Sequence, residues 1–296
     1  MNRPGVLRGS GRLRTMRRKA ANALMLTLCG VMVALGVLPL LWILVFIVRS
    51  GGSVLSLTFF THVTTPVGIP GGGIANALVG SAETVGLGLL ISAPVGVLAA
   101  FYAASHPGSG LGLVLRFGTD VLSGVPSIVM GIFAYTLIVL PMRRFSAFSG
   151  WIALAFIMLP TIIRTTEEML KLVPNSLREG SLALGAPEWR TSFSVLLPAA
   201  ANGVLTGILL AIARAAGEAA PMLFTAFGNP FMSTSLNQPI ATLPLTIYTY
   251  AISPYRDWNA QAWGTALVLI ILVLVLNVAA RGMRWWRARR LGEAVR

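Results

Sequence analysis

Long apolar runs without a single charged residue dominate this sequence. Five of them have about the 20 residues that a helix needs to cross a hydrocarbon layer ~30 Å thick, and a sixth, 148–163, is shorter. In chain order the runs are residues 20–48, 84–105, 121–140, 148–163, 191–213 and 260–280. The pattern predicts an all-α integral membrane protein with six transmembrane helices.

Composition supports this prediction. The chain of 296 residues is 55% hydrophobic and 11% charged, with a mean hydropathy of +0.78, whereas soluble domains have about 25% charged residues. The first run is too long for the apolar part of a signal peptide, so we expect it to be retained as a span. Cys29 is the single cysteine, which excludes an internal disulfide framework and a zinc cluster built on cysteines.

The net charge of +14 is concentrated at the two ends of the chain. Basic residues are frequent in a tail before the first span (residues 1–19) and in a tail after the last (residues 281–296), which bracket a six-span domain, residues 20–280. With six spans both tails lie on one side, and the positive-inside rule places them in the cytoplasm. Arg143 and Arg144 are exceptions, because they fall in a short external loop. This distribution indicates contact with membrane lipids and argues against nucleic-acid binding.

The segments between the runs differ in character. Residues 51–73 are rich in Gly and Pro and are predicted to form an external loop. Residues 228–259 are also external, and their apolar part, 240–251, either lies against the membrane or a partner or is plain loop. Residues 164–190 combine many charges with helical spacing, interrupted by Pro174 and able to end at Gly185, which predicts a cytoplasmic helical elbow.

Two charged residues stand out at the end of the fifth run. An ionised side chain deep in a bilayer costs at least ~2.5 kcal/mol on insertion scales, so Arg214 and Glu218 are expected to face the protein interior. At positions i and i+4 they share a helix face, and mutual neutralisation is one explanation. The other is that Arg214 binds an anion, because its planar guanidinium fits a tetrahedral oxyanion with two parallel hydrogen bonds. Glu218 would then hold Arg214 when the path is empty.

A third candidate for the substrate path is Arg164, at the internal end of the fourth run; the alternative is that it only anchors that end of the helix at the membrane surface. Glu83 and Asp120 are expected to be solvated at the ends of their spans. His62 and His106 have no second ligand nearby in sequence, so no metal site is predicted. The sequence contains no G-x-x-x-x-G-K-[ST] motif, so this chain is not expected to bind ATP itself.

The stretch EGSLALGAPEWRTSFSVLLP, residues 179–198, resembles the EAA loop of ABC importer permeases. It departs from that pattern by having Gly180 and Ser181 in place of two alanines. The resemblance implies a type I (MetI-like) permease fold in which residues 164–198 form a coupling loop that docks on a cytoplasmic ATPase. The residues at the motif positions, to which the resemblance assigns ATPase coupling, are Glu179, Gly180, Ser181, Gly185, Leu197 and Pro198.

A second stretch, ARAAGEAAPMLFTAFGN at residues 213–229, resembles the signature of permeases in oxyanion importers. Its A-P-M-L-F-T-A continuation, together with the stretches at 125–135 and 243–251, is similar to the permease subunit of phosphate importers, although Ala219 replaces the usual Thr. Molybdate and sulfate permeases carry similar segments and stay open as alternatives.

The resemblance implies a non-catalytic subunit of the bacterial plasma (inner) membrane. Its partners would be a second permease subunit, a dimer of the ATPase, which holds ATP and Mg, and an external phosphate-binding protein. This chain would bind no cofactor. The sequence fits two other classes of membrane protein less well. An integral membrane enzyme needs a nucleophile or base beside orienting groups, for which the spans offer poor material. A secondary transporter needs its own coupling-ion site.

Overall fold

The computed structural model describes residues 8–69 and 71–290 of the chain. It divides into two compact units, residues 1–50 and residues 51–296. The first unit is formed by helix α1 (Arg8–Gly52), a single helix of 45 residues that includes the predicted first span and continues through Pro39. The second unit is also helical.

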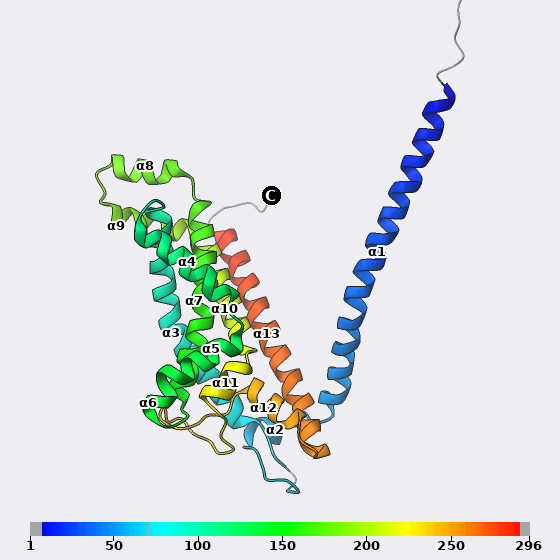
Figure 1. The fold of residues 1–296 in the computed structure, drawn as a ribbon, viewed down its shortest axis with the longest axis vertical. Coiled ribbons are helices and arrows are strands. Elements are labelled where there is room, and N and C mark those ends of the chain that lie inside the picture. The colour runs from blue at the N-terminus through cyan, green and yellow to red at the C-terminus, as the bar shows by residue number, and fades with distance from the viewer. Residues whose placement is uncertain (1–7, 70, 291–296) are drawn as a thin grey trace, which may run out of the picture. The chain divides into compact units, whose positions relative to one another are not determined.

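The helices of the second unit are α2 (Leu57–Thr61), α3 (Ala75–Ser105), α4 (Gly110–Gly124), α5 (Ser127–Ala134), α6 (Leu140–Met142), α7 (Ala147–Lys171), α8 (Asn175–Ala183), α9 (Glu188–Thr191), α10 (Leu197–Ala216), α11 (Ala220–Thr225), α12 (Leu243–Ala251) and α13 (Arg256–Arg290), with π-helical turns η1 (Tyr135–Val139) and η2 (Ser192–Leu196). Within this unit, α8 and α9 lie at one end, and α2, α6 and α12 lie at the other (Figure 1).

Five helical stretches in the described part of the chain are long and apolar enough to cross a membrane, and a bent pair of helices makes a sixth span if it is counted as one. The five are Arg14–Gly52, Ala75–Ser105, Ala147–Lys171, Glu188–Ala216 and Arg256–Ala279. The predicted all-α, six-span membrane fold is therefore confirmed. Each of the five includes most or all of one predicted apolar run, and α9, η2 and α10 join into one span.

The third predicted span, the run at residues 121–140, is not one straight helix. This run contains the break between α4 and α5, where the chain bends by 108°. Pro126 has no N–H to donate, and its ring disfavours the helical conformation of the residue before it. Val125 accordingly has φ −75° and ψ 129°, in the extended region. Periodicity alone did not reveal this break, because the residues on both sides of it are apolar.

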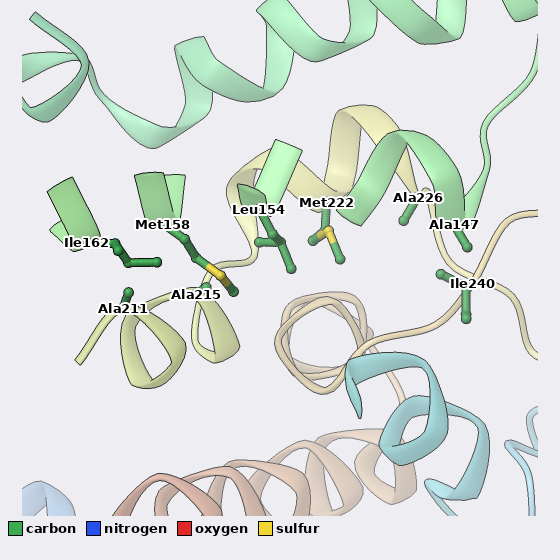
Figure 2. Packing of buried hydrophobic residues seen from close by; sticks show 9 residues of the cluster. All are labelled: Ala147, Leu154, Met158, Ile162, Ala211, Ala215, Met222, Ala226 and Ile240. Atoms are coloured by element: carbon green, nitrogen blue, oxygen red, sulfur yellow. The ribbon is translucent and has the colours of Figure 1, made fainter. Parts of the chain in front are cut away.

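Helix α7 lies at the centre of the second unit. It packs against α3 and α10 and also contacts α4, α5 and α11. Met158 and Ile162 on α7 lie next to the small side chains Ala215 and Ala211 on α10, in a buried cluster that also contains Leu154 (Figure 2). Small residues at such interfaces let two backbones approach closely, which is how helices associate where lipid tails are as apolar as the side chains.

The apolar stretch at 240–251 forms helix α12 and packs into the protein. Leu243, Leu245 and Tyr250 are buried, and α12 contacts both α13 and α3. The backbone N–H of Leu243 donates to Ser81 Oγ on α3 over 2.7 Å. This stretch is therefore neither plain loop nor a free surface, and it fixes one end of α3.

Replacing Gly80 by Ala tests how tightly α3 approaches this segment. A Cβ at Gly80 would overlap the backbone carbonyl oxygen of Ala241, whereas a Cβ at Gly86 on the same helix meets no atom within 4 Å. We expect Gly80→Ala to lower the midpoint of thermal unfolding of the detergent-purified protein by about 5 °C. Gly86→Ala is the matched control, which should leave the midpoint unchanged or raise it, because Ala favours a helix more than Gly does. Equal midpoints for the two variants would contradict the close approach.

Candidate functional site

Arg214 lies in the last turn of α10. The helix ends at Ala216, with Gly217 as its C-cap. A cation is stabilised at this end by the carbonyl groups that have no intrahelical partner. Glu218 follows the cap, so the two charges do not share one continuous helix as predicted. They still form an ion pair, with Arg214 Nε and Glu218 Oε1 3.7 Å apart.

This ion pair leaves Arg214 only partly neutralised. The Arg214 side chain is 52% exposed, and that of Glu218 is 19% exposed. The separation of 3.7 Å is beyond hydrogen-bond length. The guanidinium N–H groups of Arg214 are therefore available to another acceptor. This availability favours anion binding over mutual neutralisation as the explanation of the pair.

Arg214 and the residues around the break between α4 and α5 line the same small cavity. Its walls include Ser123 and Val125 before the break, Ser127 at the start of α5, and Pro160 on α7. The first turn of α5 has backbone N–H groups without intrahelical partners and carries partial positive charge. Arg214 and this helix start thus combine two features that favour an anion. The cavity volume is about 10 Å³, which is room for roughly one water.

Arg164 does not line this cavity. It lies inside α7, which continues to Lys171 instead of ending near residue 163. Its side chain, 60% exposed, pairs with Asp120 Oδ1 on α4 at 3.3 Å and with Glu168 Oε1 one turn further along α7 at 3.4 Å. Exposed pairs of this kind contribute little to stability. The role of Arg164 in the substrate path stays a prediction.

A more buried charge cluster was missed by the sequence analysis. Glu167 on α7 is 7% exposed, and one of its oxygens, Oε1, lies 2.7 Å from Arg116 Nε on α4 and 2.7 Å from Lys171 Nζ. Arg116 also donates to the carbonyl oxygens of Ala103 at 2.6 Å and Pro107 at 3.1 Å. The i, i+4 spacing of Glu167 and Lys171 was visible in the sequence, but the partner on α4 was not.

The elbow predicted at residues 164–190 is shorter in the structure, because residues 164–171 belong to α7; we define the elbow as residues 172–191, between α7 and η2. Pro174 is the N-cap of α8, and Gly185 follows the end of α8 with φ +80°. Its N–H donates to Leu182 O, and the N–H of Ala186 donates to Ser181 O, which is the Schellman pattern of a helix C-terminus. The predicted helix end at Gly185 is thereby confirmed.

Two contacts fold the elbow back on itself. The hydroxyls of Ser181 on α8 and Thr191 on α9 are 2.8 Å apart. Arg178 Nη2 and Glu188 Oε1 are 3.4 Å apart. The other motif residues lie on this frame: Glu179 and Gly180 are exposed on α8, and Leu197 and Pro198 begin α10 directly after η2. The elbow is thus joined to α10 without a break in the helix.

The elbow presents apolar side chains that this chain does not cover. Helix α8 has no buried residue, and exposed fractions are 90% for Leu184 and 67% for Trp189. A helix of nine residues is only marginally stable on its own. The uncovered apolar side chains and the short helix together suggest a surface that a partner completes.

Substitution of Gly185 tests the geometry of the elbow without any partner. A side chain in the left-handed region costs about 1–2 kcal/mol, and a β-branched one is especially unfavourable there. We expect Gly185→Val to speed amide hydrogen exchange across residues 175–191. Gly180→Ala, inside α8 and with no atom within 4 Å of the added Cβ, should slow exchange or leave it unchanged. Wild-type exchange rates in Gly185→Val would contradict the role of this turn.

Comparison with known proteins places the chain in a family. Residues 93–292 match the model of the binding-protein-dependent transport system inner membrane component. Among curated proteins, the phosphate transport system permease protein PstA of Yersinia pestis is 45% identical over 95% of this chain and 96% of that protein. The PstA protein of Haemophilus influenzae is 45% identical over 91% of this chain and 95% of its own length.

Solved structures give the same fold. A permease chain of the inward-facing MetNI methionine ABC transporter covers 72% of this chain and 93% of its own, with a TM-score of 0.57 and 20% identity. A chain of a bacterial alginate ABC transporter covers 94% of this chain and 97% of its own, with a TM-score of 0.64 and 12% identity. The chain belongs to the family of binding-protein-dependent transport system inner membrane components, the permeases of ABC importers.

Proposed function

We propose that this chain is the permease subunit of an ATP-driven importer that moves inorganic phosphate into the cytoplasm. The observation that carries the proposal is 45% identity, over 95% of the chain, with a protein named as a phosphate transport permease. Arg214 at the break between α4 and α5 supplies chemistry that suits a tetrahedral oxyanion. The predicted location is the bacterial inner membrane with both termini in the cytoplasm.

The exposed elbow is the proposed docking surface for a cytoplasmic ATPase dimer. Helix α8, with no buried residue, would insert into the ATPase, and ATP and Mg would be held by that partner. Because α9, η2 and α10 form one continuous span, Glu188–Ala216, a displacement of the elbow shifts the helix that carries Arg214. The chain itself transmits this movement and carries out no bond-breaking step.

Completion of the path requires a second permease subunit. Arg214 is half exposed on this chain, so in the membrane another protein surface has to enclose it, because an open cation facing lipid is costly. ATP binding would draw the elbows together and open the cavity outward to an external phosphate-binding protein. Hydrolysis would reopen it inward and release the ion to the cytoplasm.

Glu218 can contribute to the choice of ion. Its carboxylate repels a bound anion and so limits affinity, which conduction requires. A carboxylate also accepts a hydrogen bond from protonated phosphate, which fully ionised sulfate cannot donate. Molybdate or sulfate transport is the second candidate function, because all three anions are tetrahedral.

Substitution of Arg214 tests the substrate path. Two hydrogen bonds to a charged group contribute ~3 kcal/mol or more, so Arg214→Ala should reduce phosphate uptake by at least about 100-fold. Arg214→Lys keeps the charge but loses the planar fork, so its phosphate uptake should lie between that of the wild type and that of Arg214→Ala. Uptake is measured in reconstituted vesicles, with co-purification of the ATPase as the assembly control. Wild-type uptake by an assembled Arg214→Ala complex would refute the role.

Competition in the assembled complex tests the ion. We expect unlabelled phosphate to suppress labelled phosphate uptake, with molybdate and sulfate having little effect at the same concentration. Equal suppression by sulfate or molybdate would favour the second candidate function. Uptake that persists without the ATPase would instead indicate a secondary transporter.

A further inference from the structure

The walls of the Arg214 cavity are connected to the elbow in different ways. Helix α10 and helix α7, which contributes Ile157 and Pro160, both join the elbow directly. The far wall includes Ser123 and Val125 at the end of α4. Along the chain, α4 is reached from the elbow only by following the whole of α7 and returning through α6 and α5. Any direct mechanical link from the elbow to α4 therefore has to be non-covalent.

The buried charge cluster is placed to provide this link. Glu167 lies one helical turn before Lys171, the last residue of α7, after which the elbow begins. Through Arg116 it reaches α4 in that helix's second turn, and Arg116 in turn donates to Ala103 O at the end of α3. Three helix ends thus meet at one guanidinium, next to the point where the elbow enters the membrane domain.

The chemistry of the cluster makes this link stiff. A carboxylate that is 7% exposed cannot exchange its partners for water, so the loss of one partner is strongly destabilising. Arg116 is held by three acceptors, which fixes its planar fork in one orientation. The second α4–α7 pair, between Arg164 and Asp120, has both side chains at least 60% exposed at 3.3 Å, and water readily replaces such a contact.

We propose that Glu167 is a positioning residue that couples the elbow to the far wall of the substrate path, by locking the cytoplasmic halves of α4 and α7 together through Arg116. A displacement of the elbow then moves α7 and α4 as one body, while α10 moves by direct connection. The break at Val125 and Pro126, at the other end of α4, receives this movement next to Arg214. The inference rests on the proposed function, because it assigns a role in the same transport cycle.

The test measures coupling in the full complex reconstituted in vesicles. We expect Glu167→Gln to assemble with the ATPase and to hydrolyse ATP, with the amount of phosphate transported per ATP reduced by at least about tenfold, a ratio that corresponds to ~1.4 kcal/mol. Arg116→Gln should show the same defect. The defect of the double variant should be smaller than the sum of the two single defects, because both single variants remove the same Arg116–Glu167 contact.

Asp120→Asn is the matched control, since it also converts a carboxylate that joins α4 and α7 into an amide. It should change the transport ratio by less than about twofold. A Glu167→Gln complex with an unchanged ratio, or with ATP hydrolysis and transport lowered equally, overturns the inference. Where Glu167→Gln does not assemble, Glu167→Asp is measured in the same way, and wild-type coupling in that variant overturns the inference as well. A wild-type complex that carries no phosphate contradicts the proposed function instead.

Discussion

Close packing around α7 is the constraint on which the rest of the structure depends. In a membrane the hydrophobic effect gives no preference for helix–helix over helix–lipid contact, so association depends on fit. A Cβ at Gly96 on α3 would lie 2.8 Å from Ile162 Cγ2, and one at Gly207 on α10 would overlap Thr165. The two neighbours of α7 therefore approach it through positions without a side chain. This contact holds α10, and with it Arg214, in a fixed place against the central helix.

The helix breaks near Pro126 and Gly217 are tolerated because packed protein surrounds them. Backbone that leaves the helical pattern at membrane depth has unpaired polar groups, which are tolerated where protein or a water-filled cavity encloses them. Pro126 lies in the break between α4 and α5, and Gly217 caps the end of α10 three residues after Arg214. Arg214 and the residues on both sides of the Pro126 break line the same cavity. This place therefore combines unpaired N–H groups with a cation, the two features that favour an anion.

The sequence was a good guide to what depends on local physics. Apolar runs predicted the spans, and Pro174 and Gly185 correctly marked the beginning and end of α8. It failed where a property depends on residues far apart in the chain. The bend at Pro126 was hidden because proline also occurs inside continuous helices here, at Pro94 and Pro160. The partner of Glu167 could not be found either, since Arg116 is 51 residues away and only tertiary packing brings the two together.

Glu167 and Arg214 differ in how completely other residues of this chain pair their charges, and this difference suits them to different roles. Glu167 has two charged donors at 2.7 Å on one oxygen, which leaves it little capacity for a further cation. Arg214 has one carboxylate at 3.7 Å and is half exposed. Glu167 is thus compensated by two cations of this chain, whereas Arg214 is compensated only in part. A charge that is closely paired can hold helices together, but a charge that is incompletely paired retains attraction for a mobile ion. Glu167 is therefore suited to joining helix ends near the elbow, and Arg214 is suited to attracting an anion at its cavity.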